Sequence, residues 1–163
     1  MPRRAWQVPS TAYSEVVTSD ESIPGESVGG PASGNGPDAV DPEVAELAAR
    51  LFDLARAGDT ATLVAYLDAG VPANLRNRTG DSLLMLAAYH GNADLVSALL
   101  DRDADPDLAN DKGQTPLAGA VFKGYDDVVA ALVRSGADPD AGSPTARQAA
   151  TMFGREDYLH HWA

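Results

Sequence analysis

The sequence predicts an all-α fold, a solenoid of stacked helix-turn-helix units, preceded by a disordered N-terminal tail. Three observations support this prediction. Glycines recur at a spacing of 33 residues, as Gly58, Gly91 and Gly124. Apolar residues with helical spacing recur at about the same step, which is the pattern of a repeat architecture. Residues 1–40, in contrast, show neither helical nor strand periodicity.

The tail is defined by its composition. Ser, Gly and Pro make up 16 of residues 1–40, a share above the roughly 25–30% that marks low-complexity sequence. Such a segment buries too little apolar surface to offset the entropy lost on ordering. Residues 13–28, YSEVVTSDESIPGESV, nevertheless combine four acids and no base with several apolar side chains. We hypothesise that this segment contacts the folded part of the chain, and the alternative is an inert tail.

Ordered structure is expected to begin at Asp41-Pro42-Glu43. Aspartate is a good helix N-cap, and proline is tolerated in the first turn. The apolar positions Val44 and Leu47, followed by Leu51 and Leu54, then keep helical spacing. We therefore expect the folded domain to span residues 41–163.

The repeating unit is expected to contain two short helices, a glycine turn between them and a polar loop. A pair of short helices cannot bury its apolar face alone, so neighbouring pairs must stack. The units run over about 43–77, 78–110, 111–142 and 143–163. The apolar quartets in the pattern i, i+1, i+4, i+5 are Leu95, Val96, Leu99 and Leu100; Val128, Val129, Leu132 and Val133; a weaker copy at Thr62, Leu63, Tyr66 and Leu67; and a last copy at Tyr158, Leu159, Trp162 and Ala163. Because the last quartet ends with the chain, we expect the stack to be complete at that end.

One unit carries a family resemblance. Residues 111–140, DKGQTPLAGAVFKGYDDVVAALVRSGADPD, resemble the ankyrin repeat in the Thr-Pro-Leu signature, the glycine turn and the closing Gly-Ala-Asp. Residues 78–107 keep the frame but carry Ser-Leu-Leu at the signature, and the two end units look like diverged caps. The resemblance covers about 120 of the 163 residues. It implies an ankyrin-type solenoid of about eight helices.

Elementary chemistry accounts for the signature, and the chain also departs from it. Thr115 is expected to cap a helix whose first turn holds Pro116. Asp103 stands where the neighbouring units have a turn glycine, a position that Asp tolerates better than most residues. In the family a histidine follows Thr-Pro-Leu and bonds between loops; here the corresponding residues are Met85, Ala118 and Gln148. We therefore expect those bonds to be absent and the stability to be modest.

The run DRDADPD at residues 101–107 has the alternating aspartates of a calcium loop. An EF-hand needs Gly at its sixth position and Glu at its twelfth, but Pro106 and Lys112 stand there. The period explains the run better. Asp101 ends a helix, and the later aspartates of the run fall in a turn, where they accept backbone N–H bonds. A weak surface calcium site is the alternative.

Composition excludes several classes of protein. The chain has no cysteine, which rules out disulfides and Cys-based metal sites. A net charge of −12 argues against general nucleic-acid binding, which depends on neutralising phosphates. No segment approaches the roughly 18 apolar residues of a membrane span, and no secretory signal is evident. We expect a soluble, monomeric protein of the cytoplasm.

The sequence contains no evidence for catalysis or for a cofactor. Glu156 and His160 share a helix face, but no third metal ligand accompanies them. No nucleophile elbow, P-loop or dinucleotide fingerprint occurs. We expect that the protein is not an enzyme; an unrecognised carboxylate site is the alternative.

The resemblance implies that partners bind to the loop tips between units and to the inner, first helix of each unit. Carried over residue by residue, this surface comprises Arg56, Arg76, Arg78, Asp81, Tyr89, His90, Asp111, Lys112, Gln114, Phe122, Lys123, Met152 and Phe153. It holds five cations and two acids in an acidic chain, and interleaved aromatic and cationic residues are favoured at interface hot spots. Packing between inner helices is an equal alternative for Tyr89, Phe122 and Phe153. The third connection, 141–145, is too short to form a full tip.

These observations favour a non-catalytic protein–protein interaction module that binds a partner protein through its concave surface. The alternative with the same fold is a dedicated inhibitor or accessory subunit of one enzyme.

Overall fold

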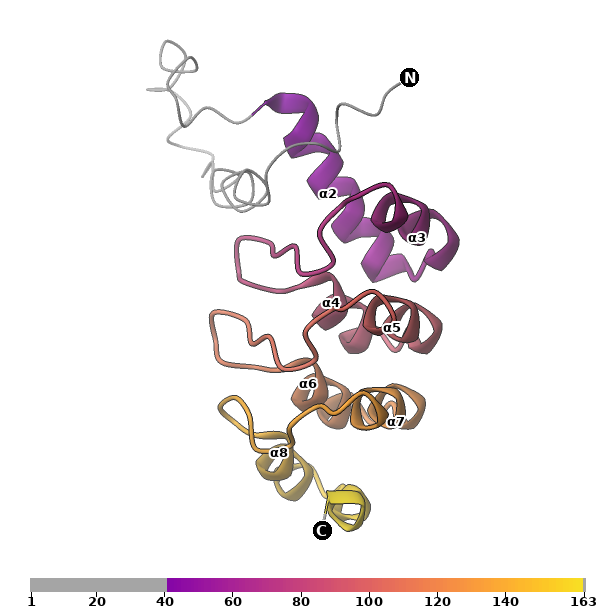
Figure 1. Ribbon diagram of the computed structural model, residues 1–163. Helices are drawn as coiled ribbons and strands as arrows, with labels where there is room; N and C mark the ends of the chain where they lie inside the picture. Colours follow the sequence, from indigo (N-terminus) through magenta and orange to yellow (C-terminus); the bar gives the residue numbers. More distant parts are fainter. Residues whose placement is uncertain (1–40, 163) are drawn as a thin grey trace, which may run out of the picture.

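The computed structural model describes residues 41–162. Residues 1–40 and residue 163 lie outside this range, and so does the predicted tail. Within 41–162 the chain forms eight helices and no strand, as the sequence predicts (Figure 1). The helices are α2 (Pro42–Ala57), α3 (Thr60–Asp68), α4 (Leu83–Tyr89), α5 (Ala93–Leu100), α6 (Pro116–Lys123), α7 (Asp126–Arg134), α8 (Ala146–Met152) and the 3-10 helix η4 (Glu156–Trp162).

The helices stack in two columns. The inner column is formed by α2, α4, α6 and α8, each packed on the next, while α3, α5 and α7 pack in the outer column. Each inner helix also contacts the helix that follows it in the chain. The long connections from α3 to α4 and from α5 to α6 project to the same side of the stack, and the connection from α7 to α8 is visibly shorter (Figure 1). The inner helices and these connections therefore share one face.

Side-chain caps fix the starts of the inner helices. The Asp41 carboxylate accepts the N–H of Glu43 at 2.9 Å, which confirms the predicted start of α2. The Thr115 hydroxyl accepts the N–H of Ala118 at 3.2 Å, and Pro116 occupies the first turn of α6. Ser82 caps α4 in the same way. Both capping hydroxyls are almost fully buried, so each bond satisfies a donor that water cannot reach.

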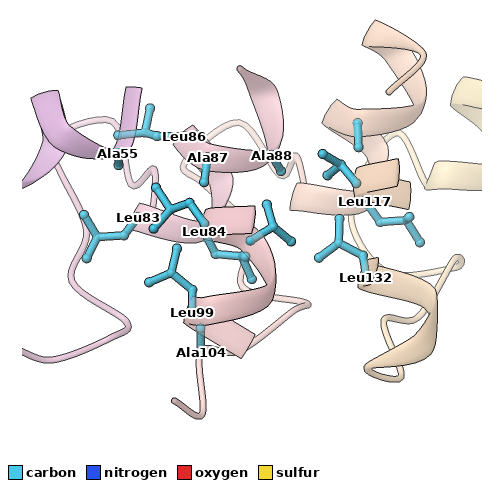
Figure 2. Close-up of a cluster of buried hydrophobic side chains, with 14 of the residues drawn as sticks. Ala55, Leu83, Leu84, Leu86, Ala87, Ala88, Leu99, Ala104, Leu117 and Leu132 are labelled. Atoms are coloured by element: carbon cyan, nitrogen blue, oxygen red, sulfur yellow. The ribbon is translucent and has the colours of Figure 1, made fainter. Parts of the chain in front are cut away.

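The apolar quartets form the core between the columns. Leu95, Val96 and Leu99 are fully buried, and Leu132 is fully buried in the next unit. The first copy is weaker, as expected, because Thr62 is exposed. Figure 2 shows Leu99 directed from α5 toward the leucines of α4. One cluster of buried residues extends from α2 to η4, so no pair of helices has a core of its own.

Left-handed glycines join each inner helix to its outer partner. Gly91 has φ +77°, and a β-carbon there would lie 3.0 Å from the ring of Tyr125. The residue after one glycine turn thus packs over the glycine of the preceding turn. Gly154 has φ +66°, but nothing lies within 4 Å of a β-carbon built on it. The two positions share a backbone conformation and differ in packing.

We expect Gly91→Ala to destabilise the protein more than Gly154→Ala. Both substitutions place alanine in the left-handed region, which costs about 1–2 kcal/mol. Gly91→Ala must also displace the Tyr125 ring, an overpacking cost of about 1–3 kcal/mol. Urea unfolding of the two variants measures the difference. Equal losses would show that the contact with Tyr125 contributes nothing.

The aspartates of residues 101–107 end α5 and bond the loop that follows it. Asp101 ends α5, as predicted. Asp103 has φ +64°, the single non-glycine residue of the described chain with a left-handed backbone, in agreement with its place at a turn-glycine position. The Asp105 carboxylate accepts the N–H of Asp107 at 2.9 Å, which is the turn bond that the sequence predicts. Among residues 41–162 no group of three or more metal-ligating side chains is placed to hold an ion.

A second set of bonds links each loop to the next, and it repeats with the 33-residue period. The Asn74 side-chain oxygen accepts the N–H of Asp105 at 2.8 Å. One unit later, the Asp107 carboxylate accepts the N–H of Asp138 at 2.8 Å. Burial raises the pKa of the Asp107 carboxyl above its ordinary value, and the neighbouring Asp105 and Asp138 raise it further, against the lowering effect of the bond from the Asp138 N–H. At the first of these two positions the acceptor is the uncharged side chain of Asn74.

We therefore expect Asp107→Asn to stabilise the protein at pH 7, by about 0.5 kcal/mol, the size of a surface charge effect. A carboxyl whose pKa is raised by folding stabilises the fold below its unfolded pKa, and this contribution is lost as pH rises through the folded pKa. Asparagine keeps the acceptor without the charge, so its advantage should shrink near pH 3. Urea unfolding at both pH values tests this.

The matched control is Asp140→Asn, one period later. There the carboxylate accepts the Nε–H of Arg147 at 2.8 Å, so losing the charge removes an attraction. This variant should be neutral or slightly less stable. A loss of stability in Asp107→Asn at pH 7 would contradict the account of the loop bonds.

Candidate functional site

Two hairpin-like tips border the inner face. The first is closed by an antiparallel bridge between Arg76 and Ser82. In the second, the N–H of Asn110 donates to the carbonyl oxygen of Gln114 at 2.9 Å. The third connection turns between Gly142 and Thr145, and its short length agrees with the expectation that it forms no full tip. The described surface therefore has two projecting tips.

The two tips are bonded to each other. The Arg76 guanidinium donates to the carbonyl oxygens of Gly80 and Ala109, each at 3.1 Å, and lies 3.6 Å from the Asp111 carboxylate. The N–H of Asp111 donates to the carbonyl oxygen of Thr79 at 3.0 Å. Arg76 and Asp111 thus hold the two tips together, which sequence reasoning did not anticipate when it placed both residues in the binding set.

A groove lies between the tips and the inner helices α2 and α4. Its volume is about 770 Å³. The predicted residues Arg56, Arg78, Asp81, Tyr89, His90, Lys112 and Gln114 line it. These residues are drawn from two helices and both tips, so the fold brings together side chains that are up to 58 positions apart in the chain. We call this space the tip groove.

An apolar hollow continues from the tip groove along α6 and α8. Its volume is about 160 Å³, and the predicted residues Tyr89, Gln114, Phe122, Met152 and Phe153 are in its lining. Met85, Tyr89 and Gln114 line both spaces. The tip groove and the apolar hollow therefore form one continuous surface.

The aromatic side chains of this surface both pack and remain exposed. The rings of Tyr89 and Phe122 stack with centroids 6.4 Å apart, and those of Phe122 and Phe153 meet edge to face at 4.7 Å. Nevertheless 36% of Tyr89, 40% of Phe122 and 46% of Phe153 is exposed, and Met152 is 66% exposed. Packing between inner helices and binding of a partner are thus compatible roles for these aromatic residues. Their mutual contacts fix the rings while one side of each faces solvent.

The charges around the tip groove are partly neutralised from within. Arg56 pairs with Asp53 at 2.9 Å. The Asp81 carboxylate accepts the Thr79 hydroxyl at 2.7 Å and the Asn110 amide at 2.8 Å. Both lining carboxylates therefore already have donors.

Two lysines of the predicted set have no carboxylate partner in the described part of the chain. The ammonium groups of Lys112 and Lys123 form no ion pair within residues 41–162. Lys123 lies outside the lining of both spaces, with its Nζ 4.8 Å from the centroid of the Tyr89 ring, where it adds positive charge at their junction. The surface can therefore attract an anionic group while offering apolar contact beside it.

Sequence reasoning assigned only Arg56 of α2 to the surface. Ala45, Ala49, Phe52 and Asp53 of this helix line the tip groove together with Arg56. Their three- and four-residue spacing marks one face of a helix, so the signal was present in the sequence. It was overlooked because the first unit has no signature to show which face points inward.

Comparison with known proteins agrees with this architecture. A family model described as ankyrin repeats in three copies matches residues 51–143, more than half of the chain. The chain belongs to the ankyrin repeat family. A curated protein of Pseudomonas aeruginosa that is named as an ankyrin repeat protein is 56% identical over 57 residues. That stretch is 35% of this chain and 33% of the relative, so the chain spans about a third of the length of the relative it matches.

The ankyrin histidine that normally joins the loops is replaced here by other groups. Its three equivalents are buried or engaged elsewhere: Met85 and Ala118 are buried, and the Gln148 amide oxygen accepts the N–H of Thr145 in a capping box. Arg76 and the backbone of Asp111 supply tip-to-tip bonds instead. Within residues 41–162 the histidine-type bonds are therefore absent, as expected, and Arg76 and Asp111 join the tips by other bonds that were not expected.

The other shifted pKa values of the described chain belong to contacts outside the surface. The side-chain hydrogen bond between Asp68 and Arg102 lowers the pKa of the carboxyl and raises that of the guanidinium; it joins the ends of α3 and α5. Burial raises the pKa of Tyr158 to about 12, helped by its hydrogen bond to Asp126. Each of these contacts bridges neighbouring units.

Within residues 41–162 no helix has both the length and the apolar character to cross a membrane.

Proposed function

We propose that this ankyrin repeat protein is a non-catalytic interaction module that holds a partner protein in the tip groove and the apolar hollow. Ankyrin repeats are general protein–protein interaction modules, and the family is typically non-catalytic. To this general family role we add the surface that binds the partner, its mixed cationic and aromatic chemistry, and the absence of an enzymatic role. We also propose that the chain is a monomer of the cytoplasm.

The observation that carries the proposal is the exposed aromatic row beside cationic tips. Tyr89, Phe122 and Phe153 keep roughly two-fifths of their area in solvent although each ring is fixed by its neighbours. Large, preorganised aromatic side chains lose little entropy when a partner covers them, and they dominate binding energy at many interfaces. A surface built only for stability would have no need to expose these rings, with the Lys123 ammonium 4.8 Å from the centroid of the Tyr89 ring.

Affinity capture tests the proposal. The full chain is immobilised, and proteins of the native host are captured at low and high salt. We expect a protein to bind in stoichiometric amount and to elute as salt rises, because charge contributes to the contact. An enzyme as the dominant species, with its activity altered by the chain, would favour the alternative of a dedicated inhibitor or accessory subunit. Substrate turnover by the purified chain itself would contradict the proposal.

A further inference from the structure

The two ends of the surface differ in the chemistry that an occupant needs. At the tips, Lys112 has no carboxylate partner within residues 41–162, while Asp53 and Asp81 are already bonded. At the other end, Phe122, Met152 and Phe153 expose a large apolar area. An occupant must therefore carry negative charge in one part and apolar side chains in an adjacent part.

A segment of the same chain has this composition. Residues 13–28, YSEVVTSDESIPGESV, hold four acids and no base. Three of the acids, Asp20, Glu21 and Glu26, lie toward the folded domain. The apolar side chains are concentrated at the far end, in 13–17. The order of charged and apolar parts thus matches the order of the tip groove and the apolar hollow, counted from α2 toward α8.

The part of the chain between this segment and Asp41 is long enough for the segment to reach the tip groove. Residues 29–40 form a 12-residue link to Asp41, which spans up to about 40 Å when extended. Helix α2 has 16 residues, or about 24 Å, and its inner face lines the tip groove. The link therefore reaches past the whole of α2. A link of this length holds the segment at an effective concentration on the order of millimolar, so a weak contact suffices for occupancy.

We propose that residues 13–28 occupy this surface and compete with the partner. Asp20, Glu21 and Glu26 lie at the cationic tips, and Tyr13, Val16 and Val17 lie in the hollow along α6 and α8. The proposal rests on the proposed function, because it concerns the same surface. The tail then acts as a built-in competitor, and a partner displaces it when the ratio of partner concentration to its Kd exceeds the ratio of the effective concentration of the tail to the Kd of the tail contact.

Paramagnetic broadening in the full chain tests this contact. The chain has no cysteine, so Ser19→Cys gives one site for a nitroxide label. We expect the amide signals of Tyr89, Phe122 and Lys112 to lose most of their intensity, and those of the outer helices α5 and α7, one helix layer farther away, to lose clearly less. Raising the salt from about 0.05 M to about 0.5 M should restore the lost signals, because the Debye length falls several-fold.

The matched control keeps the label and neutralises the tail, as Glu15→Gln, Asp20→Asn, Glu21→Gln and Glu26→Gln. All four residues lie outside the core of residues 41–162, and the change should restore the signals. Uniform broadening, or broadening confined to the outer helices, would overturn the proposal. So would broadening that appears only when labelled chains are mixed with isotopically enriched unlabelled ones, since the occupant would then be a second copy. In either case partner capture through the same surface remains a separate result, so the proposed function is judged independently.

Discussion

Leu99→Ala is expected to lower the free energy of unfolding by about 2–5 kcal/mol, the range of buried leucine truncations. Leu99 is fully buried and points from α5 toward Leu83 and Leu84 of α4 (Figure 2). The surrounding helices are held by neighbours on both sides, so the cavity cannot collapse easily. Urea unfolding of the wild-type and variant proteins, fitted with one shared m-value, gives the change in the free energy of unfolding. A single transition is expected, because one core cluster joins all the helices of the described chain.

Leu100→Ala is the matched control for this prediction. It removes the same atoms from the next residue of the same helix, but Leu100 is only partly buried. Its loss should be clearly smaller. A loss below about 0.5 kcal/mol for Leu99→Ala, typical of surface changes, would mean that the quartets are not the core and that the repeat has been misread.

Replacing Arg78, Lys112 and Phe122 together by alanine is expected to weaken partner binding by at least about 100-fold, or about 2.7 kcal/mol. The three side chains come from both tips and from α6, and each lines the tip groove or the apolar hollow. The fold should survive, because all three are exposed. Binding of the captured partner to each variant measures the loss, and circular dichroism verifies the fold.

The control replaces Asp101 and Asp107 by asparagine. Neither residue lines the tip groove or the apolar hollow, and both belong to the loop that follows α5. Partner affinity should stay within about twofold, a change of less than 0.5 kcal/mol. If the aspartate variant lost the partner and the groove variant kept it, the inner surface would be the wrong site.

Features with a local cause were predictable from the sequence. The cap at Thr115 and the helix start at Asp41 depend on residues only two or three positions away. The left-handed backbone of Asp103 follows from its place in the period. The all-α stack follows from the same period, because a 33-residue spacing leaves little choice of architecture.

Features that depend on contacts between units were harder to predict. Arg76 was assigned to the binding set by its place at a tip, but its guanidinium reaches carbonyl oxygens of both tips. The sequence shows that a cation is there and not which way it points. The loop bonds of Asn74 and Asp107 come from the same place in the period. Asp140 occupies the next such place but accepts from the Arg147 side chain instead, so the position in the period alone does not fix the bond.

The most direct test of the binding surface is amide hydrogen exchange of the full chain, alone and saturated with its captured partner. The account predicts slower exchange in the inner helices α2, α4, α6 and α8 and in the two tips, with the outer helices α3, α5 and α7 unchanged. Slower exchange confined to the outer helices would contradict it.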